Sequence, residues 1–494
     1  MPADPQDPTR RQLLTRAGSG AAGLGLLSLF GSAAYAANDP AAAVQRALAP
    51  HLPTRAKHCI FLFMFGGPSQ MDLFDYKPEL QKRHGQTVEL ERRRRQVRSA
   101  ILLGSQRSFA QYGETGQWCS DALPLLSQHM DKLAVIKSLH TDSFAHGSAV
   151  LQMNSSFTRQ GSPSLGSWLQ HGLGTDNPDL PGYVVMHDPR GGPISGAANW
   201  ASGYMPAGYQ GTLFRATGDP LLYMSPEPSV GGRWGMTDTM KRAQLQLLQD
   251  LNASYAATRA GYSDLPARSA AHELALRMEH SAPDALNIED EDEETLAMYA
   301  VDGKPGEHRL SIGPATFGRQ CLIARRLIER GVRYVQIYQG GGHQQQTWDA
   351  HHGVEENLSI HCPEIDRPVS ALLTDLERTG LLDETLVIWG GEFGRQPVSQ
   401  QAGDGQVANA DGRDHNPKAF TMWLAGAGIK PGSYGETDEL GTMAVVDRYH
   451  VRELHATILK LMGLDYRRLT YHYGGLDRRM TGPEDVRIID DILA

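Results

Sequence analysis

The chain has 494 residues and a formal net charge of −9 at pH 7. This length exceeds what one ordinary core requires, so it allows one large domain with insertions or two domains. The acidic balance argues against a nucleic-acid partner, because nucleic-acid-binding proteins normally present a basic face.

The first residues follow the order of a secretory signal. Arg10 and Arg11 precede an apolar stretch over residues 17–30, and Ala34-Tyr35-Ala36 ends it. Paired arginines favour the twin-arginine export route, which implies a periplasmic or secreted protein and the export machinery as a partner. We expect a signal peptide over residues 1–36; its three arginines face two aspartates, so its removal leaves a net charge of −10. An uncleaved anchor or a chance arginine pair is the alternative.

No later segment is apolar for the ~20 residues that a bilayer requires, so we expect no stable membrane span. Residues 37–57 are a polar lead-in linker, and residues 58–494 form the main domain. Its apolar runs of strand length are rich in Val, Ile, Phe and Tyr and continuous rather than alternating, as in strands buried on both faces of a parallel sheet. They cover residues 59–65, 133–137, 183–186, 334–338, 386–389 and 420–424.

Helical patterns lie between these runs, at residues 317–328, 369–376 and 450–462, each followed by a glycine. Strands alternating with such helices predict an α/β fold, a doubly wound, mostly parallel sheet with helices on both faces. Residues 191–306 begin with Gly- and Pro-rich loops and continue into polar helices, including 267–280. We interpret this region as a cap or insertion over the sheet.

The four cysteines are too few and too scattered for a disulfide scaffold or a Cys-x-x-Cys zinc site. We expect free buried thiols, with a bridge between Cys119 and Cys362 as an alternative.

Ligands of an open parallel sheet bind beyond the carboxyl ends of its strands. Polar clusters follow four of the predicted strands, at residues 66–75, 138–147, 340–352 and 390–417, and each alone is explained by a tight turn or a helix cap. Together they place imidazoles and carboxylates on loops of different strands, the usual construction of a hydrolytic metal site. Asp349, His351 or His352, and His415 are the best set of three, and they leave a position for water or substrate, as in catalytic zinc sites.

At these residues the chain resembles domain-of-unknown-function family 1501, a group of twin-arginine-exported bacterial proteins. The resemblance lies in residues 66–78, 321–332, 386–395, 412–417 and 453–459. That family is similar to a branch of the alkaline phosphatase and sulfatase superfamily, which uses metal ions beside a nucleophile at a helix start to cleave phosphate or sulfate esters.

The resemblance implies roles for further residues. Asp349 with His351 or His352 looks like the superfamily's Asp and His metal pair, and His415 like its later lone His. Glu392-Phe393-Gly394 stands where Asp-His-Gly is usual, so Glu392 keeps a carboxylate while an imidazole is lost. Gly66-Gly67 stands where an Asp ligand is usual, with Asp72 as a substitute.

The segment Thr141-Asp142-Ser143 resembles the alkaline phosphatase nucleophile segment, with Ser143 as nucleophile or, alternatively, helix cap. The formylglycine motif of ordinary sulfatases is absent. Arg395 and Arg413 are candidates for binding the anion, or for holding a loop carboxylate. Ser69, His140, His146 and His343 are candidates for binding the anion or supporting the metal ligands, and His140 and His146 could also be ligands themselves.

Three functions remain open. The first is an exported hydrolase of phosphate or sulfate esters, acting on a small molecule or a glycan, with a divalent metal that is zinc or else calcium or manganese. The second is a catalytically impaired, single-metal binding protein for anionic glycans or envelope components. The third is a structural envelope partner without metal.

Overall fold

The computed structural model describes residues 50–92, 96–215, 238–257, 264–342, 344–400 and 411–494. The expected signal peptide and most of the lead-in therefore lie outside the described residues. The end of the lead-in is fixed to the C-terminal part of the chain, since the backbone N–H groups of Arg55 and Ala56 donate to the carbonyl of Leu461. None of the helices described here combines the length and the apolar character needed to cross a membrane.

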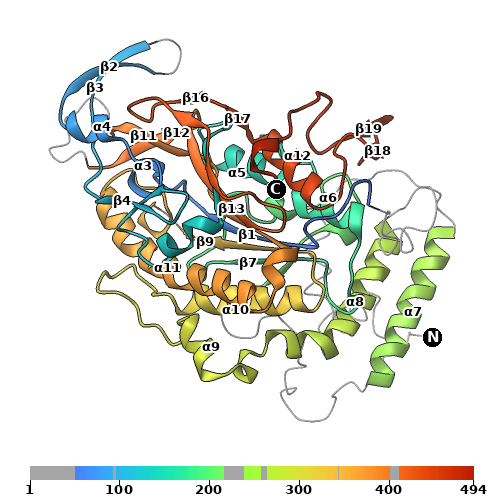
Figure 1. The fold of residues 1–494 in the computed structure, drawn as a ribbon. Helices are drawn as coiled ribbons and strands as arrows, with labels where there is room; N and C mark the ends of the chain where they lie inside the picture. The colour runs from blue at the N-terminus through green and yellow to red at the C-terminus, as the bar shows by residue number, and fades with distance from the viewer. Residues whose placement is uncertain (1–49, 93–95, 216–237, 258–263, 343, 401–410) are drawn as a thin grey trace, which may run out of the picture.

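A single large sheet forms the centre of the protein (Figure 1). Within the described residues it has nine strands in the order β14-β6-β13-β10-β1-β9-β7-β8, with β17 beside β6. All six predicted strands are confirmed. The strands are β1 (His58–Met64), β6 (Leu133–His140), β7 (Tyr183–His187), β8 (Thr212–Phe214), β9 (Tyr334–Gln339), β10 (Thr385–Gly390), β13 (Phe420–Gly426), β14 (Gly432–Tyr434) and β17 (Tyr449–His450).

The sheet is mostly parallel, with one reversed strand. β1 pairs in parallel with β9 and β10, and β7 pairs in parallel with β8 and β9. The reversed strand is β13, which runs antiparallel to both β10 and β6. The reason lies in the connection from β10, which passes through the hairpin of β11 (Gly394–Ser399) and β12 (Arg413–Asn416) without a crossover helix. The chain therefore re-enters the sheet at the end where it left, which reverses its direction.

Helices cover both faces of the sheet, as predicted. Figure 1 shows α10 (Ala315–Glu329) and α11 (Val354–Arg378) on one side, and α5 (His146–Ser155), α6 (Leu165–Leu173) and α12 (Val451–Leu461) on the other. Alternate residues of β1 contribute to separate cores: Ile60 and Leu62 pack in one cluster, Cys59 and Phe61 in the other. This two-sided burial explains the continuous apolar runs of the sequence.

The region 191–306 contains η4 (Gly196–Trp200), η5 (Ala207–Tyr209), β8, α7 (Asp238–Ala257), α8 (Asp264–Leu286), η6 (Ile288–Asp290) and α9 (Glu293–Met298). The sequence predicted loops and helices for this region but not β8, which pairs with β7 and extends the sheet at its edge. α8 packs against α10, and α9 against α11. In Figure 1, α7 and α8 lie at the right of the molecule, whereas β11 and β12 lie at the upper left. The long helices α7 and α8 thus lie away from the β11–β12 hairpin, whereas η4 packs against α5 and α6.

The remaining elements are short. They are α3 (Gln70–Leu73), α4 (Pro78–Lys82), η3 (Leu126–Lys132), η7 (Gln344–Gln346), η8 (Leu381–Glu384), η9 (Asp490–Ile492) and the two-stranded pairs β2–β3 (Thr87–Arg92, Gln96–Ile101), β4–β5 (Phe109–Tyr112, Gln117–Ser120), β15–β16 (Glu436–Thr437, Ala444–Val446) and β18–β19 (Tyr471–Tyr473, Leu476–Arg478). All four cysteines are buried and unbonded, including Cys119 and Cys362.

Candidate metal centre

The glycine pair after β1 lets a second loop cross the end of that strand. Gly66 has a φ of +117°, and a Cβ on it would lie 2.6 Å from the backbone nitrogens of Trp348 and Asp349. The N–H of Trp348 donates to the carbonyl of Phe65 at 2.9 Å. Only glycine permits both this conformation and this approach. The close crossing places Asp349 directly beyond β1.

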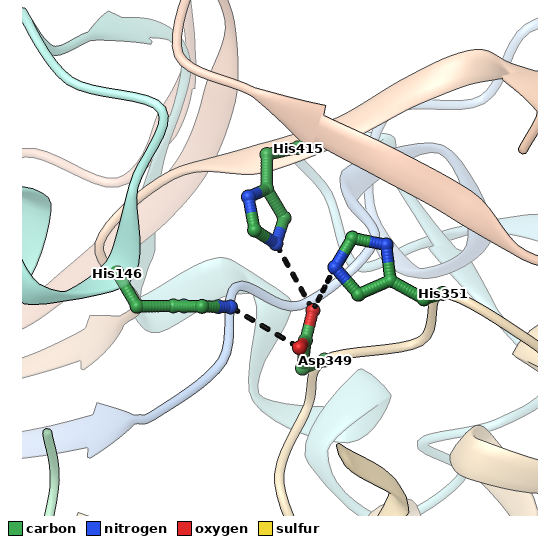
Figure 2. Close-up of side chains that lie close together, drawn as sticks. All are labelled: His146, Asp349, His351 and His415. Atoms are coloured by element: carbon green, nitrogen blue, oxygen red, sulfur yellow. Dashed lines mark hydrogen bonds and ion pairs between the residues drawn. The ribbon is translucent and has the colours of Figure 1, made fainter. Parts of the chain in front are cut away.

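Three imidazoles surround the carboxylate of Asp349, and each comes from a different segment (Figure 2). His351 and His415 place Nε2 3.1 Å from Oδ1 of Asp349, and His146 places Nε2 3.2 Å from Oδ2. His146 begins α5, Asp349 and His351 lie between β9 and α11, and His415 lies on β12. Three segments distant in sequence therefore meet at one point.

The other nitrogen of each imidazole has an acceptor oxygen. Nδ1 of His146 contacts Oε1 of Glu392 at 2.6 Å, and Nδ1 of His415 contacts the carbonyl of Phe144 at 2.7 Å. Nδ1 of His351 contacts the side-chain oxygen of Gln400. These oxygens can only accept, so each Nδ1 carries a proton. Nε2 then either carries a second proton that it donates to Asp349 or, once deprotonated, offers its lone pair to an ion.

Glu392 orients His146 through Nδ1, the ring nitrogen that does not face Asp349. The Glu392 side chain is fully buried, and its two oxygens accept the N–H of Gly66 at 3.1 and 3.2 Å. The sequence suggested this residue as a metal ligand. Its contacts instead place it behind His146, where a carboxylate fixes the ring of a ligating histidine.

Arg395 is buried beneath Asp349. It donates to Oδ1 of Asp349 at 2.7 Å and to the carbonyl of Gly67 at 2.9 Å, and it also bonds the carbonyl of Gly66. With no exposed surface, the guanidinium is not placed to bind an anion from solvent. The sequence left two roles open for Arg395, binding an anion or holding a loop carboxylate. Its contacts support the second role.

The surroundings shift the pKa values of the cluster. Burial opposes ionisation of Asp349, but Arg395 and the hydrogen bonds from His146 and His415 outweigh it and hold the pKa of this carboxyl well below its usual range. Burial also disfavours the imidazolium of His146, yet hydrogen bonds to Asp349 and Glu392 raise its pKa to about 9. The pKa of His415 is lowered, chiefly by burial.

These residues fit a divalent metal ion. One ligand atom from each of His146, Asp349, His351 and His415 lies within 4.8 Å of the others. Zinc with bonds of about 2.0–2.1 Å separates tetrahedral ligand atoms by roughly 3.3 Å, so small side-chain rotations would bring these four atoms within reach of one ion, and water or substrate would take a fifth position. Nε2 of His146 is buried and faces the carboxylate of Asp349 at 3.2 Å, so this nitrogen is directed into the cluster. Imidazoles with one carboxylate suit zinc or manganese better than calcium, which prefers oxygen.

Other sequence candidates lie outside this cluster. His352 is exposed, and no contact links its ring to Asp349 in the part of the chain described. Asp72 pairs with Arg413, whose Nε donates to Oδ2 of Asp72 at 2.9 Å, and Ser69 donates to the same oxygen. Both ionic side chains are buried, so this trio fixes α3 to the β11–β12 hairpin and is not placed to bind metal or anion.

The predicted nucleophile segment lies just before His146. Ser143 Oγ is 2.6 Å from Ser148 Oγ and accepts the N–H of Ala145 at 3.1 Å, which is the local bonding of a helix start. Thr141 donates to Gln152. His140 packs its ring 5.1 Å from that of His450, and burial above all lowers its pKa to about 4. His343 lies outside the described residues.

His146 is the member of the cluster that sequence reasoning underestimated. The sequence leaves it open as a metal ligand or a partner of the anion, because nothing in its local sequence gives the direction of the first turn of α5. Phe393 was noted only as a lost imidazole, yet its ring lies 4.4 Å from that of His415 and 4.9 Å from that of His146. It thus provides an apolar wall of the site.

Comparison with known proteins gives a family and distant structural relatives. The family described as "Protein of unknown function (DUF1501)" matches residues 56–493. No curated protein matches the chain. Among solved structures, a mutant alkaline phosphatase from the Antarctic bacterium TAB5 with magnesium bound is 11% identical, over 84% of this chain and 99% of that chain, with a TM-score of 0.34.

Two other solved structures are similar at the same level. The lipoteichoic acid synthase LtaP from Listeria monocytogenes is 10% identical over 90% of this chain and 78% of that chain, with a TM-score of 0.34. A phosphonate monoester hydrolase from Silicibacter pomeroyi is 12% identical over 69% of this chain and 68% of that chain, with a TM-score of 0.28.

Proposed function

Because this chain belongs to the DUF1501 family, whose description assigns no activity, we propose its function from the cluster itself: a metal-dependent hydrolase of phosphate or sulfate esters. One observation carries the proposal. Three Nε2 atoms and a carboxylate converge, while each Nδ1 is already bound to an acceptor. Three imidazoles and a carboxylate arranged in this way supply four donor atoms suited to a divalent metal ion.

His146, Asp349, His351 and His415 would hold that ion. A bound divalent ion polarises an ester oxygen and lowers the pKa of a water molecule, which is the chemistry that hydrolysis at neutral pH needs. Arg395 holds the carboxylate of Asp349 from below, so this ligand is oriented before any ion binds. Phe393 excludes water from one side of His415. The attacking group is either water or Ser143, which precedes His146 by three residues.

The first experiment measures metal in the purified mature protein. We expect wild type to retain about one zinc or manganese ion per chain, and Asp349→Ala and His415→Ala to lose it. His472 and Asp477 form an exposed imidazole–carboxylate pair, 2.8 Å apart, so Asp477→Ala is the matched control and keeps the ion. A metal-free wild type after reconstitution with each ion would refute the proposal.

The second experiment tests turnover. Aryl phosphate, aryl phosphonate and aryl sulfate esters are supplied with zinc, manganese or calcium, and we expect at least one to be hydrolysed and chelator to abolish the reaction. Ser143→Ala separates the two attacking groups, because turnover persists in this variant if water attacks and is lost if the serine does.

A binding protein that keeps one ion without turnover is the second candidate. Phe393 favours it, because an apolar ring lies beside Glu392, where no further imidazole can complete a second metal site. This candidate is correct if the metal is present, no ester in the panel turns over, and an anionic glycan such as a heparin oligosaccharide raises the Tm of the metal-loaded protein.

We also propose export by the twin-arginine route, on the basis of Arg10 and Arg11. Replacement of both arginines by lysine should leave the protein in the cytoplasmic fraction of cells, whereas wild type is recovered from the periplasm or medium. Equal distribution of the two would contradict this route.

A further inference from the structure

A groove lies along the edge of the sheet and shares no residue with the metal cluster. Two adjoining hollows, of about 200 and 850 Å³, form it. Both are lined by Trp118, Lys137, Ser433 and Glu436, which makes them one continuous space. These residues come from β5, β6, β14 and β15. We call this space the edge groove.

Trp118 gives the edge groove an open aromatic face. Its side chain is 37% exposed, whereas the other tryptophans of the described structure are at most 4% exposed. Tyr76 supports the indole with a ring-centroid distance of 4.6 Å and packs in turn on Phe109 at 4.9 Å. The indole is therefore held in place before a ligand arrives, which reduces the entropy cost of binding.

The polar groups around this ring are available to a ligand. In the described structure, no protein group forms an ion pair or side-chain hydrogen bond with Lys137 or Glu436, the charged residues shared by both hollows. The half-buried ammonium donates, and the carboxylate accepts. An aromatic face flanked by one donor and one acceptor suits a ligand that has both an apolar face and hydroxyl groups.

The charge balance excludes an anion as the occupant. The lining carries three lysines, Lys77, Lys137 and Lys430, and five carboxylates, Asp75, Glu436, Asp447, Asp490 and Asp491, so the edge groove has no excess of positive charge. Phosphate and sulfate groups require such an excess. Apolar side chains are sparse in the lining, with Val135, Val446 and Leu493 among them, which disfavours an apolar peptide or a lipid.

We propose that the edge groove binds a neutral saccharide, whose sugar ring stacks on Trp118 and whose hydroxyl groups bond Lys137 and Glu436. A pyranose presents C–H groups on its face and hydroxyls at its rim, which matches the arrangement of these three side chains. The larger hollow accommodates further units of the same chain. This site is separate from the metal cluster, so its test does not depend on an ion.

Isothermal titration of the mature protein with neutral hexasaccharides tests the proposal. The probes are maltohexaose, cellohexaose, xylohexaose, mannohexaose and N-acetylchitohexaose, with a heparin hexasaccharide as the anionic comparison. We expect at least one neutral probe to bind with a Kd of about 1 mM or tighter and to change the tryptophan fluorescence. Trp118→Ala should weaken binding by about tenfold or more, and Trp118→Phe by less.

Leu476→Ala, which removes another exposed apolar side chain, is the control and should bind as wild type does. Chelator-treated protein should also bind equally, so that failure here is distinguishable from failure of the proposed hydrolase. Three results would overturn the inference: no neutral probe binds, only the heparin fragment binds, or Trp118→Ala binds as wild type does with an unchanged Tm.

Discussion

Replacement of Glu392 by glutamine tests how the cluster orients its ligands. Glu392 is fully buried and accepts the Nδ1 proton of His146 at 2.6 Å and the N–H of Gly66. Glutamine keeps the size and one acceptor oxygen, so Gly66 retains a partner. The change removes the charge behind His146, while the rings of His351 and His415 keep their own acceptors.

The expected effect is on metal affinity. Loss of a partner behind a ligating histidine weakens metal binding by about 10- to 100-fold, which corresponds to roughly 1.4 to 2.7 kcal/mol. Competition between the protein and a fluorescent zinc chelator measures the Kd directly. Thermal unfolding of the metal-free variant, followed by circular dichroism, verifies that the fold persists.

Asp477→Asn is the matched control, because it removes the same charge from an exposed imidazole pair. Its zinc affinity should equal that of wild type. If Glu392→Gln binds zinc as tightly as wild type, the charge of Glu392 does not support His146 as a metal ligand.

Three further predictions follow from other contacts. His351→Ala should weaken zinc binding by at least about 100-fold, whereas His352→Ala should leave it unchanged in the same competition assay, because only His351 reaches Asp349. Asp72→Ala should lower the free energy of unfolding by about 3–5 kcal/mol, because Arg413 would be buried without its partner; a loss below about 1 kcal/mol in urea titrations would contradict this. His455 is buried, and its pKa is lowered from 6.5 to about 4, chiefly by burial. Between these values the unfolded chain binds a proton that the native ring does not, so stability falls as pH is lowered from about 6.5 to about 4, by up to roughly 3 kcal/mol. Urea titrations across this range should show a smaller loss for His455→Gln, and an equal slope would refute the assignment.

The strands and the convergence of Asp349 with His415 were predictable from the sequence. Continuous apolar runs identify strands buried on both faces, and the ends of parallel strands meet at one edge of a sheet. The Nε2 of His415 indeed lies 3.1 Å from Asp349. That these two residues bind a metal stays a prediction, because proximity alone does not demonstrate an ion.

The burial of particular side chains and the direction of one strand were not predictable from the sequence. Arg395 and Arg413 are fully buried in a hairpin whose local sequence is polar, because their partners come from residues more than 40 positions away. The choice between His351 and His352 depends on the turn between them, which sequence spacing does not specify. The reversal of β13 follows from the absence of a crossover helix after β10. The apolar run of β13 does not indicate this reversal, because its pattern is the same whichever way the strand runs in the sheet.

The charges of the cluster distinguish the two metal-dependent functions from the metal-free one. Two carboxylates, Asp349 and Glu392, face one guanidinium, that of Arg395, so the fixed charge is one negative. A proton on His146 brings this net charge to zero, whereas a bound divalent ion makes the net charge positive. Positive potential in a partly enclosed site attracts anions and stabilises negative charge that develops during ester cleavage. A phosphate or sulfate ester is thus attracted only to the cluster with a divalent ion bound. A metal-dependent enzyme or single-metal binding protein must show ion-dependent anion binding at this site, and a metal-free structural protein must show none.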